Sequence, residues 1–129
     1  MSHRFELTVY YEDTDMGGIV YYANYLKFIE RARSTWVAQL GVDQLALQAA
    51  GVVFAVRAIQ AEYLAPARLG DLLEVVSQRR SSTPARWIFH QEVQRAGQVL
   101  FTAEVTIVAL TEAGKPTRLP AELRRNSNP

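Results

Sequence analysis

Cysteine is absent from the 129 residues of this sequence. Disulfides, zinc sites built on thiolates and cysteine nucleophiles are therefore excluded. A chain without cysteine suits a reducing compartment, so we expect a cytoplasmic protein. Histidine is almost as scarce, since only His3 and His90 occur and they lie far apart in the sequence. With no cysteine to join them, we expect no metal site.

Long apolar runs and an excess of charge of one sign are also missing. No uninterrupted apolar segment approaches the roughly 20 residues of a membrane-spanning helix. The first residues lack the apolar core of a signal peptide. The formal net charge is +1, which gives no general attraction to nucleic acid or to anionic membranes. We therefore expect no nucleic-acid binding and no stable membrane insertion.

The remaining composition is ordinary for a globular protein. Hydrophobic residues make up 49% and charged residues 21% of the sequence. A domain of this size buries roughly two-thirds of its unfolded surface, which is enough for one core. We expect a single domain over residues 1–129, with a disordered tail at residues 124–129.

Apolar periodicity predicts one long helix among several strands. Residues 5–11 alternate as in a half-buried strand, whereas residues 22–40 carry apolar side chains at helical spacing until Gly41. A shorter helix is predicted over residues 43–50, with Asp43 as its N-cap. Strand patterns then recur four times between turn-forming segments, over residues 52–63, 72–79, 87–94 and 99–110.

The order of these elements favours an α+β fold. Strands that follow one another through short turns pair antiparallel, and residues 95–98 (RAGQ) carry a hairpin signal. The long helix is apolar over more than half of its circumference, so it needs extensive cover. We therefore expect an antiparallel sheet that curves over this helix.

The most informative segment is residues 11–21, with the sequence YEDTDMGGIVY. It places Asp13 and Asp15 one residue apart, between a predicted strand and the start of the long helix. Unpaired main-chain N–H groups and the positive end of the helix dipole gather at such a position. A carboxylate beside preorganised main-chain donors is the arrangement that acyl-transfer chemistry requires.

Two segments carry a family likeness, residues 11–33 and residues 62–71 (EYLAPARLGD). Both resemble the 4-hydroxybenzoyl-CoA thioesterase family, and within it the Tol–Pal-associated acyl-CoA thioesterases. The likeness extends over about residues 4–123. It implies a hot-dog fold, in which a five-stranded antiparallel sheet wraps around a long central helix. It also implies homodimers or homotetramers with sites at the subunit interface, and hydrolysis of acyl-CoA thioesters without metal or cofactor.

The resemblance also implies roles for particular residues. The catalytic carboxylate of the family falls on Asp15, and the main-chain N–H that polarises the thioester carbonyl falls on Tyr22. Much of the Tol–Pal subgroup has histidine at this second position, so this chain lacks any contribution of that side chain. The substrate is expected to pass along the rest of the loop, which consists of Gly17, Gly18, Ile19 and Val20.

The acids of this region also have structural interpretations. Instead of a catalytic role, Asp15 could have the structural role of capping a tight bend through local hydrogen bonds. Asp13 is expected to stabilise the turn, with Asn24 orienting the loop from the first turn of the helix. Glu30 is a second candidate for the acting acid, because some unrelated hot-dog thioesterases use a helical glutamate. An intrahelical ion pair of Glu30 with Lys27 or Arg33 is the favoured explanation.

The phosphates of CoA call for arginine or lysine. We favour the pair Arg79 and Arg80 at a predicted strand end, from a set that also includes Arg57, Arg68 and Arg86. Three large aromatic side chains are expected in the core or in an interface and not in a ligand site, namely Trp36, Trp87 and Phe89.

The leading hypothesis is an acyl-CoA thioesterase that uses Asp15 as nucleophile or as general base. The alternative is a non-catalytic module that binds an acyl thioester or an acyl-carrier protein in the same groove. A dehydratase of the hot-dog type is disfavoured, because no histidine and acid pair occurs in the loop. Turnover separates the first two hypotheses, since only the enzyme releases free thiol.

Overall fold

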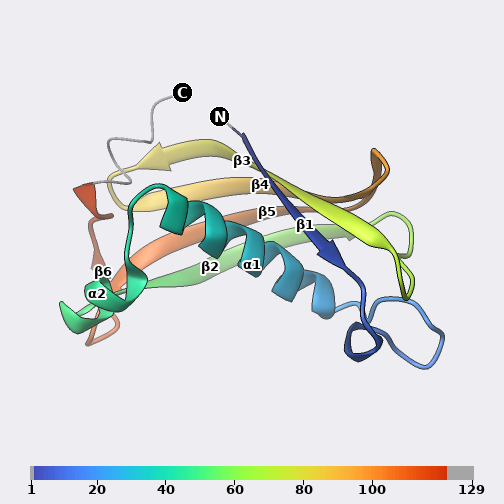
Figure 1. The fold of residues 1–129 in the computed structure, drawn as a ribbon. Coiled ribbons are helices and arrows are strands. Elements are labelled where there is room, and N and C mark those ends of the chain that lie inside the picture. Colours follow the sequence, from blue (N-terminus) through green and yellow to red (C-terminus); the bar gives the residue numbers. More distant parts are fainter. Residues whose placement is uncertain (1, 122–129) are drawn as a thin grey trace.

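The computed structural model describes residues 2–121 and confirms the predicted α+β class. Figure 1 shows a curved sheet with one long helix lying across it. The elements in chain order are β1 (Ser2–Thr8), a short 3-10 helix (Tyr11–Asp13), α1 (Asn24–Gln39), α2 (Gln44–Ala49), β2 (Val52–Tyr63), β3 (Leu72–Thr83), β4 (Arg86–Arg95), β5 (Gln98–Thr111) and β6 (Pro116–Thr117). The tail predicted for residues 124–129 lies outside the described residues.

The sheet is antiparallel throughout, with the strand order β1-β3-β4-β5-β2. These five strands and the helix that they enclose are the hot-dog architecture that the family resemblance implies. A two-residue strand, β6, pairs with β5 and adds a short sixth strand. Within the described residues β1 and β2 are the edges of the sheet, and β2 pairs with β5 alone.

Helix α1 forms because its apolar residues recur on one side at helical spacing. The buried members of this stripe are Tyr25, Phe28, Ile29, Ala32, Trp36 and Val37. The helix begins at Asn24, two residues later than predicted, because the chain first makes a turn at residues 22–23. It ends as predicted, since Gly41 has a φ of +90° just after the last helical residues.

The shorter helix and the hairpin also form where the sequence predicts them. The Asp43 side chain accepts hydrogen bonds from the main-chain N–H groups of Leu45 and Ala46, at 3.0 and 3.1 Å, and so caps α2. In the hairpin between β4 and β5, Ala96 and Gly97 have φ angles of +50° and +83°. Two consecutive positive φ angles match the right-handed twist of the flanking strands.

Two strands, β1 and β3, differ from their predicted bounds by more than one residue. Strand β1 begins at Ser2, three residues before the predicted start. The first strand ends at Thr8 and not at residue 11, because the chain turns there into the 3-10 helix. Strand β3 continues to Thr83, through a segment that we expected to be a loop. A register shift between Arg79 and Ser81 lets β3 stay paired with β4 beyond that point.

One hydrophobic cluster joins α1 to the concave face of the sheet. Phe28 of the helix and Phe89 and Phe101 of the sheet are at most 1% exposed. The ring of Tyr25 stacks on Phe101 with a centroid separation of 4.9 Å, which fixes the first turn of α1 against β5. The predicted core positions Trp36, Trp87 and Phe89 are all buried.

Candidate active site

The loop between β1 and α1, residues 9–23, is a compact double turn. Thr14 and Val20 form an isolated antiparallel bridge. Inside this bridge the Asp15 N–H donates to the Ile19 carbonyl at 2.9 Å, and the Gly18 N–H donates to the Asp15 carbonyl at 3.0 Å. Gly18 has a φ of +76°, which favours glycine at this corner. The main chain of the loop is therefore largely fixed by its own hydrogen bonds.

Asp13 lies on the inner side of this loop and is 4% exposed. One carboxylate oxygen accepts the Tyr10 N–H at 2.9 Å, and the other accepts the Asn24 side-chain amide at 2.7 Å. Its carbonyl oxygen accepts the Tyr21 N–H at 2.9 Å. Asp13 thus joins the end of β1 to the start of α1, which confirms the structural roles predicted for Asp13 and Asn24.

Asp15 lies on the outer side of the loop and is exposed. Its Oδ1 accepts the Gly17 N–H at 2.8 Å, so it makes the local turn that the alternative interpretation predicts. Its Oδ2 has no hydrogen-bond partner among residues 2–121. A Cβ atom at Gly17 would lie 3.3 Å from Oδ1, which is tighter than ordinary contact. The carboxylate is therefore oriented by one oxygen and open at the other.

Tyr22 lies in the turn directly before α1, next to the Ala23 N-cap. Its N–H and that of Ala23 donate no hydrogen bond to any residue that the structure describes, whereas the Tyr21 and Asn24 N–H groups are both paired. Its carbonyl oxygen accepts the Tyr63 hydroxyl at 2.9 Å, which links this turn to the end of β2. An unpaired main-chain donor thus stands seven residues after the open carboxylate.

A second segment, residues 66–71, supports this loop. It belongs to residues 62–71, which carry part of the family likeness. Main-chain interactions join it to the loop. Ile19 and Arg68 form an antiparallel bridge, the Val20 N–H donates to the Ala67 carbonyl, and the Leu69 N–H donates to the Gly18 carbonyl. The Ala67 N–H in turn donates to the Tyr25 hydroxyl at 3.1 Å. Of the residues predicted to line the substrate path, Gly17 and Gly18 are exposed, Ile19 is half-buried and Val20 is 3% exposed, so Val20 belongs to the core of the loop.

An ion pair holds the supporting segment in place. The Asp71 carboxylate accepts the Arg68 N–H at 2.8 Å and the Arg95 guanidinium at 2.7 Å. Burial alone would raise the pKa of Asp71, but these hydrogen bonds and the charges of both arginines lower it below its usual value. Sequence reasoning missed Arg95, because it lies in the β4–β5 hairpin, far from both segments along the chain.

The predicted phosphate-binding pair does not lie near this loop within one chain. Arg79 is seven residues along β3 from Leu72, which corresponds to roughly 23 Å of strand. Its guanidinium lies 5.6 Å from the centre of the Trp87 ring, and burial lowers its pKa. Arg80 is exposed on the neighbouring position. Arg68, which pairs with Ile19, is the candidate arginine that the structure brings to the loop.

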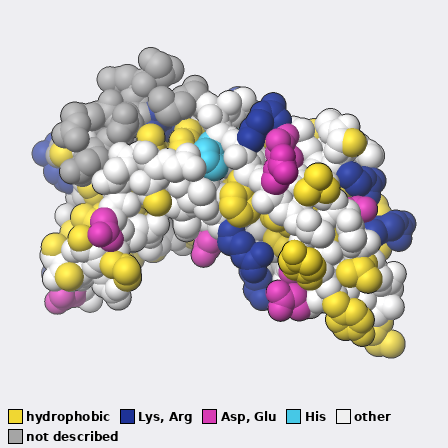
Figure 2. Space-filling view, viewed as in Figure 1, with side chains coloured by type: hydrophobic (Ala, Val, Ile, Leu, Met, Phe, Trp, Pro, Cys, Tyr) yellow, Lys and Arg dark blue, Asp and Glu magenta, His cyan; other side chains and the backbone are white. Residues whose placement is uncertain are grey.

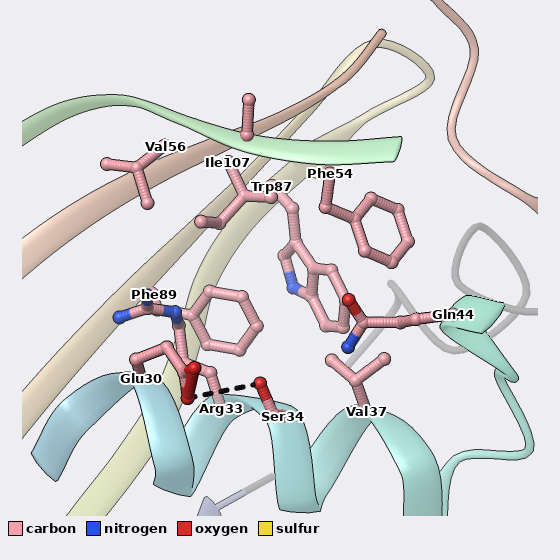
Figure 3. Close-up of a pocket in the computed structure, with 11 residues that line it drawn as sticks. Glu30, Arg33, Ser34, Val37, Gln44, Phe54, Val56, Trp87, Phe89 and Ile107 are labelled. Atoms are coloured by element: carbon pink, nitrogen blue, oxygen red, sulfur yellow. Dashed lines mark hydrogen bonds between the residues drawn. The ribbon is translucent and has the colours of Figure 1, made fainter. Parts of the chain in front are cut away.

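A cavity of about 250 Å³ lies between α1 and the β2 side of the sheet. Figure 3 shows its two walls, with Glu30, Arg33 and Ser34 on the helix and Phe54, Trp87 and Phe89 on the sheet. The cavity lies beside the second half of α1, whereas the loop with Asp15 lies at its start. Within one chain the cavity and the open carboxylate are therefore separate.

The predicted ion pair of Glu30 with Lys27 or Arg33 is wrong. No salt bridge involves Glu30 in the part of the chain that the structure describes. Its carboxylate accepts the Ser34 hydroxyl at 3.4 Å, and Arg33 instead donates to the Gln91 side chain at 2.9 Å. The reason is that Gln91 is fully buried and its carbonyl oxygen needs a donor.

Gln91 is a buried polar centre that sequence reasoning missed. Its amide nitrogen donates to the Ile29 carbonyl and to the Ser77 hydroxyl, both at 2.9 Å. With Arg33 on its oxygen, Gln91 connects α1, β3 and β4 through one side chain. The sequence does contain one signal for a buried polar residue here. Gln91 lies midway between Phe89 and Val93, so the alternation of the strand places its side chain on the core side.

The curved sheet around one long helix places the chain in the hot-dog class of proteins. More particularly, the chain belongs to the Thioesterase-like superfamily, whose family model matches residues 9–126. No helix among residues 2–121 is long and apolar enough to cross a membrane.

Individual relatives cover nearly the whole chain. An acyl-CoA thioester hydrolase, YbgC, from Escherichia coli is 41% identical over 122 residues, which are 93% of this chain and 91% of that protein. The YbgC acyl-CoA thioesterase from Haemophilus influenzae is 37% identical over 93% of this chain and 90% of its own length. A probable thioesterase from Bartonella henselae matches in structure with a TM-score of 0.87 and 35% identity, over 93% of this chain and all of that one.

Proposed function

We propose that this enzyme hydrolyses acyl-CoA thioesters at the loop between β1 and α1. Asp15 is the acting carboxylate, and the Tyr22 main-chain N–H is the donor to the thioester carbonyl. The reaction class is supported by the two YbgC relatives, which are 41% and 37% identical over 93% of the chain. The assignment of the residues rests on one observation, namely an exposed carboxylate and an unpaired N–H in the same loop.

The chemistry follows from these two groups. The Tyr22 N–H donates to the carbonyl oxygen of the thioester and stabilises the negative charge that develops there. The free Asp15 oxygen either attacks the carbonyl carbon, forming a mixed anhydride that water then cleaves, or removes a proton from the attacking water. On both routes the carbon–sulfur bond breaks and CoA leaves as a thiolate. A thiolate is a good leaving group, so no strong general acid is required.

The decisive experiment is the variant Asp15→Asn. It keeps an acceptor for the Gly17 N–H but removes the nucleophile and base. We expect kcat to fall by at least about 100-fold, with an unchanged circular dichroism spectrum. Glu30→Gln is the matched control, because Glu30 is the other exposed acid considered for the role, and it should retain the ability to turn over acyl-CoA. If Glu30→Gln lost thioesterase activity and Asp15→Asn retained it, Glu30 and not Asp15 would be the acting carboxylate.

We also infer a homodimer joined through β2. This edge strand is twelve residues long, and four of its apolar side chains are between 39% and 49% exposed, namely Val53, Val56, Ile59 and Tyr63. A long edge strand with exposed apolar residues is a template for pairing with a second strand. A second copy of β2 would cover these side chains and continue the sheet.

Antiparallel pairing of two β2 strands would also complete the site. The start of β2, at Phe54, lines the cavity, and its end, at Tyr63, is bonded to the Tyr22 turn. Because antiparallel strands exchange ends, Tyr63 of the partner subunit would lie near Phe54. The loop of one subunit would then stand beside the cavity of the other, so that the acyl group enters a cavity contributed by the partner.

The variant Val56→Lys tests this assembly. A lysine in the middle of the edge strand should prevent pairing, giving the mass of a monomer in light scattering together with loss of thioesterase activity. Leu72→Lys is the control, because Leu72 is 59% exposed at the other side of the sheet. An oligomer that survives Val56→Lys would contradict pairing through β2.

The thiol carrier is CoA in this proposal, and Arg68, which pairs with Ile19 of the loop, is the arginine that would bind its phosphates. Arg68→Gln should raise KM for acyl-CoA with little effect on kcat. Arg80→Gln tests the pair that the sequence favours. If KM rose more in Arg80→Gln than in Arg68→Gln, Arg79 and Arg80 would be the phosphate site.

An acyl-carrier protein is a second candidate for the thiol carrier. Tyr10, Tyr11 and Met16 are strongly exposed around the loop, and Figure 2 shows apolar side chains gathered at that end of the molecule. Such a surface suits contact with a protein. A comparison of kcat/KM for the same acyl group on CoA and on acyl-carrier protein decides between the two carriers.

A further inference from the structure

Arg33 is a charged side chain built into the wall of the cavity. One guanidinium nitrogen donates to the buried Gln91 oxygen at 2.9 Å, which fixes the direction of the side chain. No carboxylate of residues 2–121 lies within 4.0 Å of it. Burial lowers the pKa of Arg33, and the charge of Glu30 offsets this only in part. Arg33 is thus a fixed donor whose other N–H groups have no acid to bind.

Glu30 lines the same cavity one helical turn earlier. It accepts only a long hydrogen bond of 3.4 Å from Ser34. A strong donor and a strong acceptor therefore share one wall without reaching each other. A neutral hydroxyl group fits between them, because it accepts from Arg33 and donates to Glu30. A carboxylate would gain the same bond from Arg33 but would meet the negative charge of Glu30.

The opposite wall is apolar. Phe54, Trp87 and Phe89 form most of it, and the indole N–H of Trp87 is buried without a partner in the described part of the chain. Figure 3 shows this indole reaching from the sheet toward the helix. The charged groups of the cavity, Glu30 and Arg33, therefore lie on the helix wall and face an aromatic surface.

We propose that Arg33 is the specificity-determining residue of this cavity, and that it selects acyl groups with an oxygen near their far end. This inference rests on the proposed function, in which the acyl group enters the cavity from the partner's loop. The preferred acyl group is apolar along its length and ends in a hydroxyl. A plain alkyl chain leaves Arg33 without an acceptor at a site from which water is partly excluded.

Matched pairs of CoA thioesters test this inference. The pairs are saturated acyl chains of six, eight and ten carbons, each with and without a terminal hydroxyl. At the length that best spans the cavity we expect kcat/KM for the hydroxylated chain to exceed that of the plain chain by about tenfold. The corresponding chain with a terminal carboxylate should fall between the two. A preference for the plain chain at every length would overturn the proposal.

Two variants of α1 assign the preference to Arg33. Arg33→Met keeps much of the apolar stem but leaves the buried Gln91 oxygen without its donor, so its unfolding free energy is measured beside its kinetics, and the ratio within each pair should fall to about one. Arg31→Met is the matched control, because Arg31 is an exposed arginine on the same helix outside this cavity, and it should keep the wild-type ratio. An unchanged ratio in Arg33→Met would contradict the assignment.

Measurements of ligand binding test the role of Arg33 independently of thioester hydrolysis. Thioether analogues of the same chains, in which the carbonyl is replaced by CH₂, bind without turnover. Calorimetry should give about tenfold tighter binding of the hydroxylated analogue to wild type, and no difference in Arg33→Met. This outcome would support the role of Arg33 even if no thioester were hydrolysed. Equal binding of both analogues to wild type would refute it, even in an active thioesterase.

Discussion

The inner and outer sides of the loop between β1 and α1 differ in how their polar groups are used. On the inner side, Asp13 is buried and both carboxylate oxygens are bonded, to the Tyr10 N–H and to Asn24. On the outer side, Asp15 is exposed with one oxygen free, and the Tyr22 N–H is unpaired within the described residues. Two identical side chains, two positions apart, thus serve the fold and the proposed chemistry separately.

This difference follows from the cost of leaving polar groups unpaired. A buried carboxylate without partners is strongly unfavourable, so Asp13 must saturate its hydrogen bonds. Exposed groups such as Asp15 can exchange water for substrate at little cost to stability. An unpaired polar group in a rigid loop is therefore the property to look for in a site. We expect the two sides of the loop to respond to substitution in opposite ways.

The largest expected effect is on turnover at the outer side. Asp15→Asn should lower kcat by at least about 100-fold while the free energy of unfolding changes by less than about 0.5 kcal/mol, because the exposed side chain supports one local bond. Paired measurements of thiol release and of denaturant unfolding check this. Parallel losses of activity and stability would show that Asp15 belongs to the fold as much as Asp13 does.

The second effect is on stability at the inner side. Asp13→Ala leaves the Tyr10 N–H and the Asn24 amide without acceptors in a buried site, which should cost about 2–3 kcal/mol of unfolding free energy. Urea unfolding measures this loss. Asp15→Ala is the control, and we expect it to unfold almost as wild type does. A stable Asp13→Ala protein would mean that water replaces the carboxylate.

A smaller effect is expected where the supporting segment is held by Asp71 and Arg95. The folded-state pKa of Asp71 is depressed, so its contribution is present above the unfolded value of about 3.9 and is lost as pH falls through the folded value. Wild type should exceed Asp71→Asn in unfolding free energy by about 1 kcal/mol at pH 7. The difference should shrink below about pH 4.

The control for this pH dependence is an ion pair elsewhere. Arg4 of β1 and Glu74 of β3 form such a pair, in which the Arg4 side chain is 60% exposed. Glu74→Gln should change stability very little at any pH, because exposed pairs are screened by solvent. A difference between wild type and Asp71→Asn that does not vary with pH would show that packing, and not charge, holds the supporting segment.

Patterns along the chain predicted the fold and the position of the loop. Strand β2 was predicted at its observed bounds, and Asp43 and Gly41 were correctly identified as helix boundary residues. These features depend on periodicity and on local main-chain preferences, which short stretches of sequence encode. The structural role predicted for Asp13 is confirmed by its hydrogen bonds, whereas the catalytic role that the family likeness implies for Asp15 stays a prediction.

Most of the missed features depend on contacts between distant segments. Arg33 was expected to pair along its own helix, but a buried glutamine 58 residues away competes for it and wins. Arg95 reaches Asp71 across 24 residues. Arg79 was placed at a strand end because of the Ser-rich segment, which instead continues the strand. The partner of a side chain is decided by which polar groups the fold buries together, and spacing along the chain does not contain that information.

The smallest effect is expected at the two glycines of the loop, and it separates carboxylate position from main-chain strain. In Gly17→Ala the new Cβ would lie 3.3 Å from the Asp15 Oδ1, so the carboxylate must shift by a few tenths of an ångström. We expect kcat to fall by about three- to tenfold with stability unchanged, since misplacement of a reacting group is costly in rate.

In Gly18→Ala nothing lies within 4 Å of the Cβ, but the φ of +76° is unfavourable for alanine, so stability should fall by about 1 kcal/mol. Steady-state kinetics and thermal unfolding of both variants check this contrast. If Gly17→Ala lost stability and kept its kcat, the turn made by Asp15 would serve the fold, and the outer side of the loop would not be specialised for chemistry.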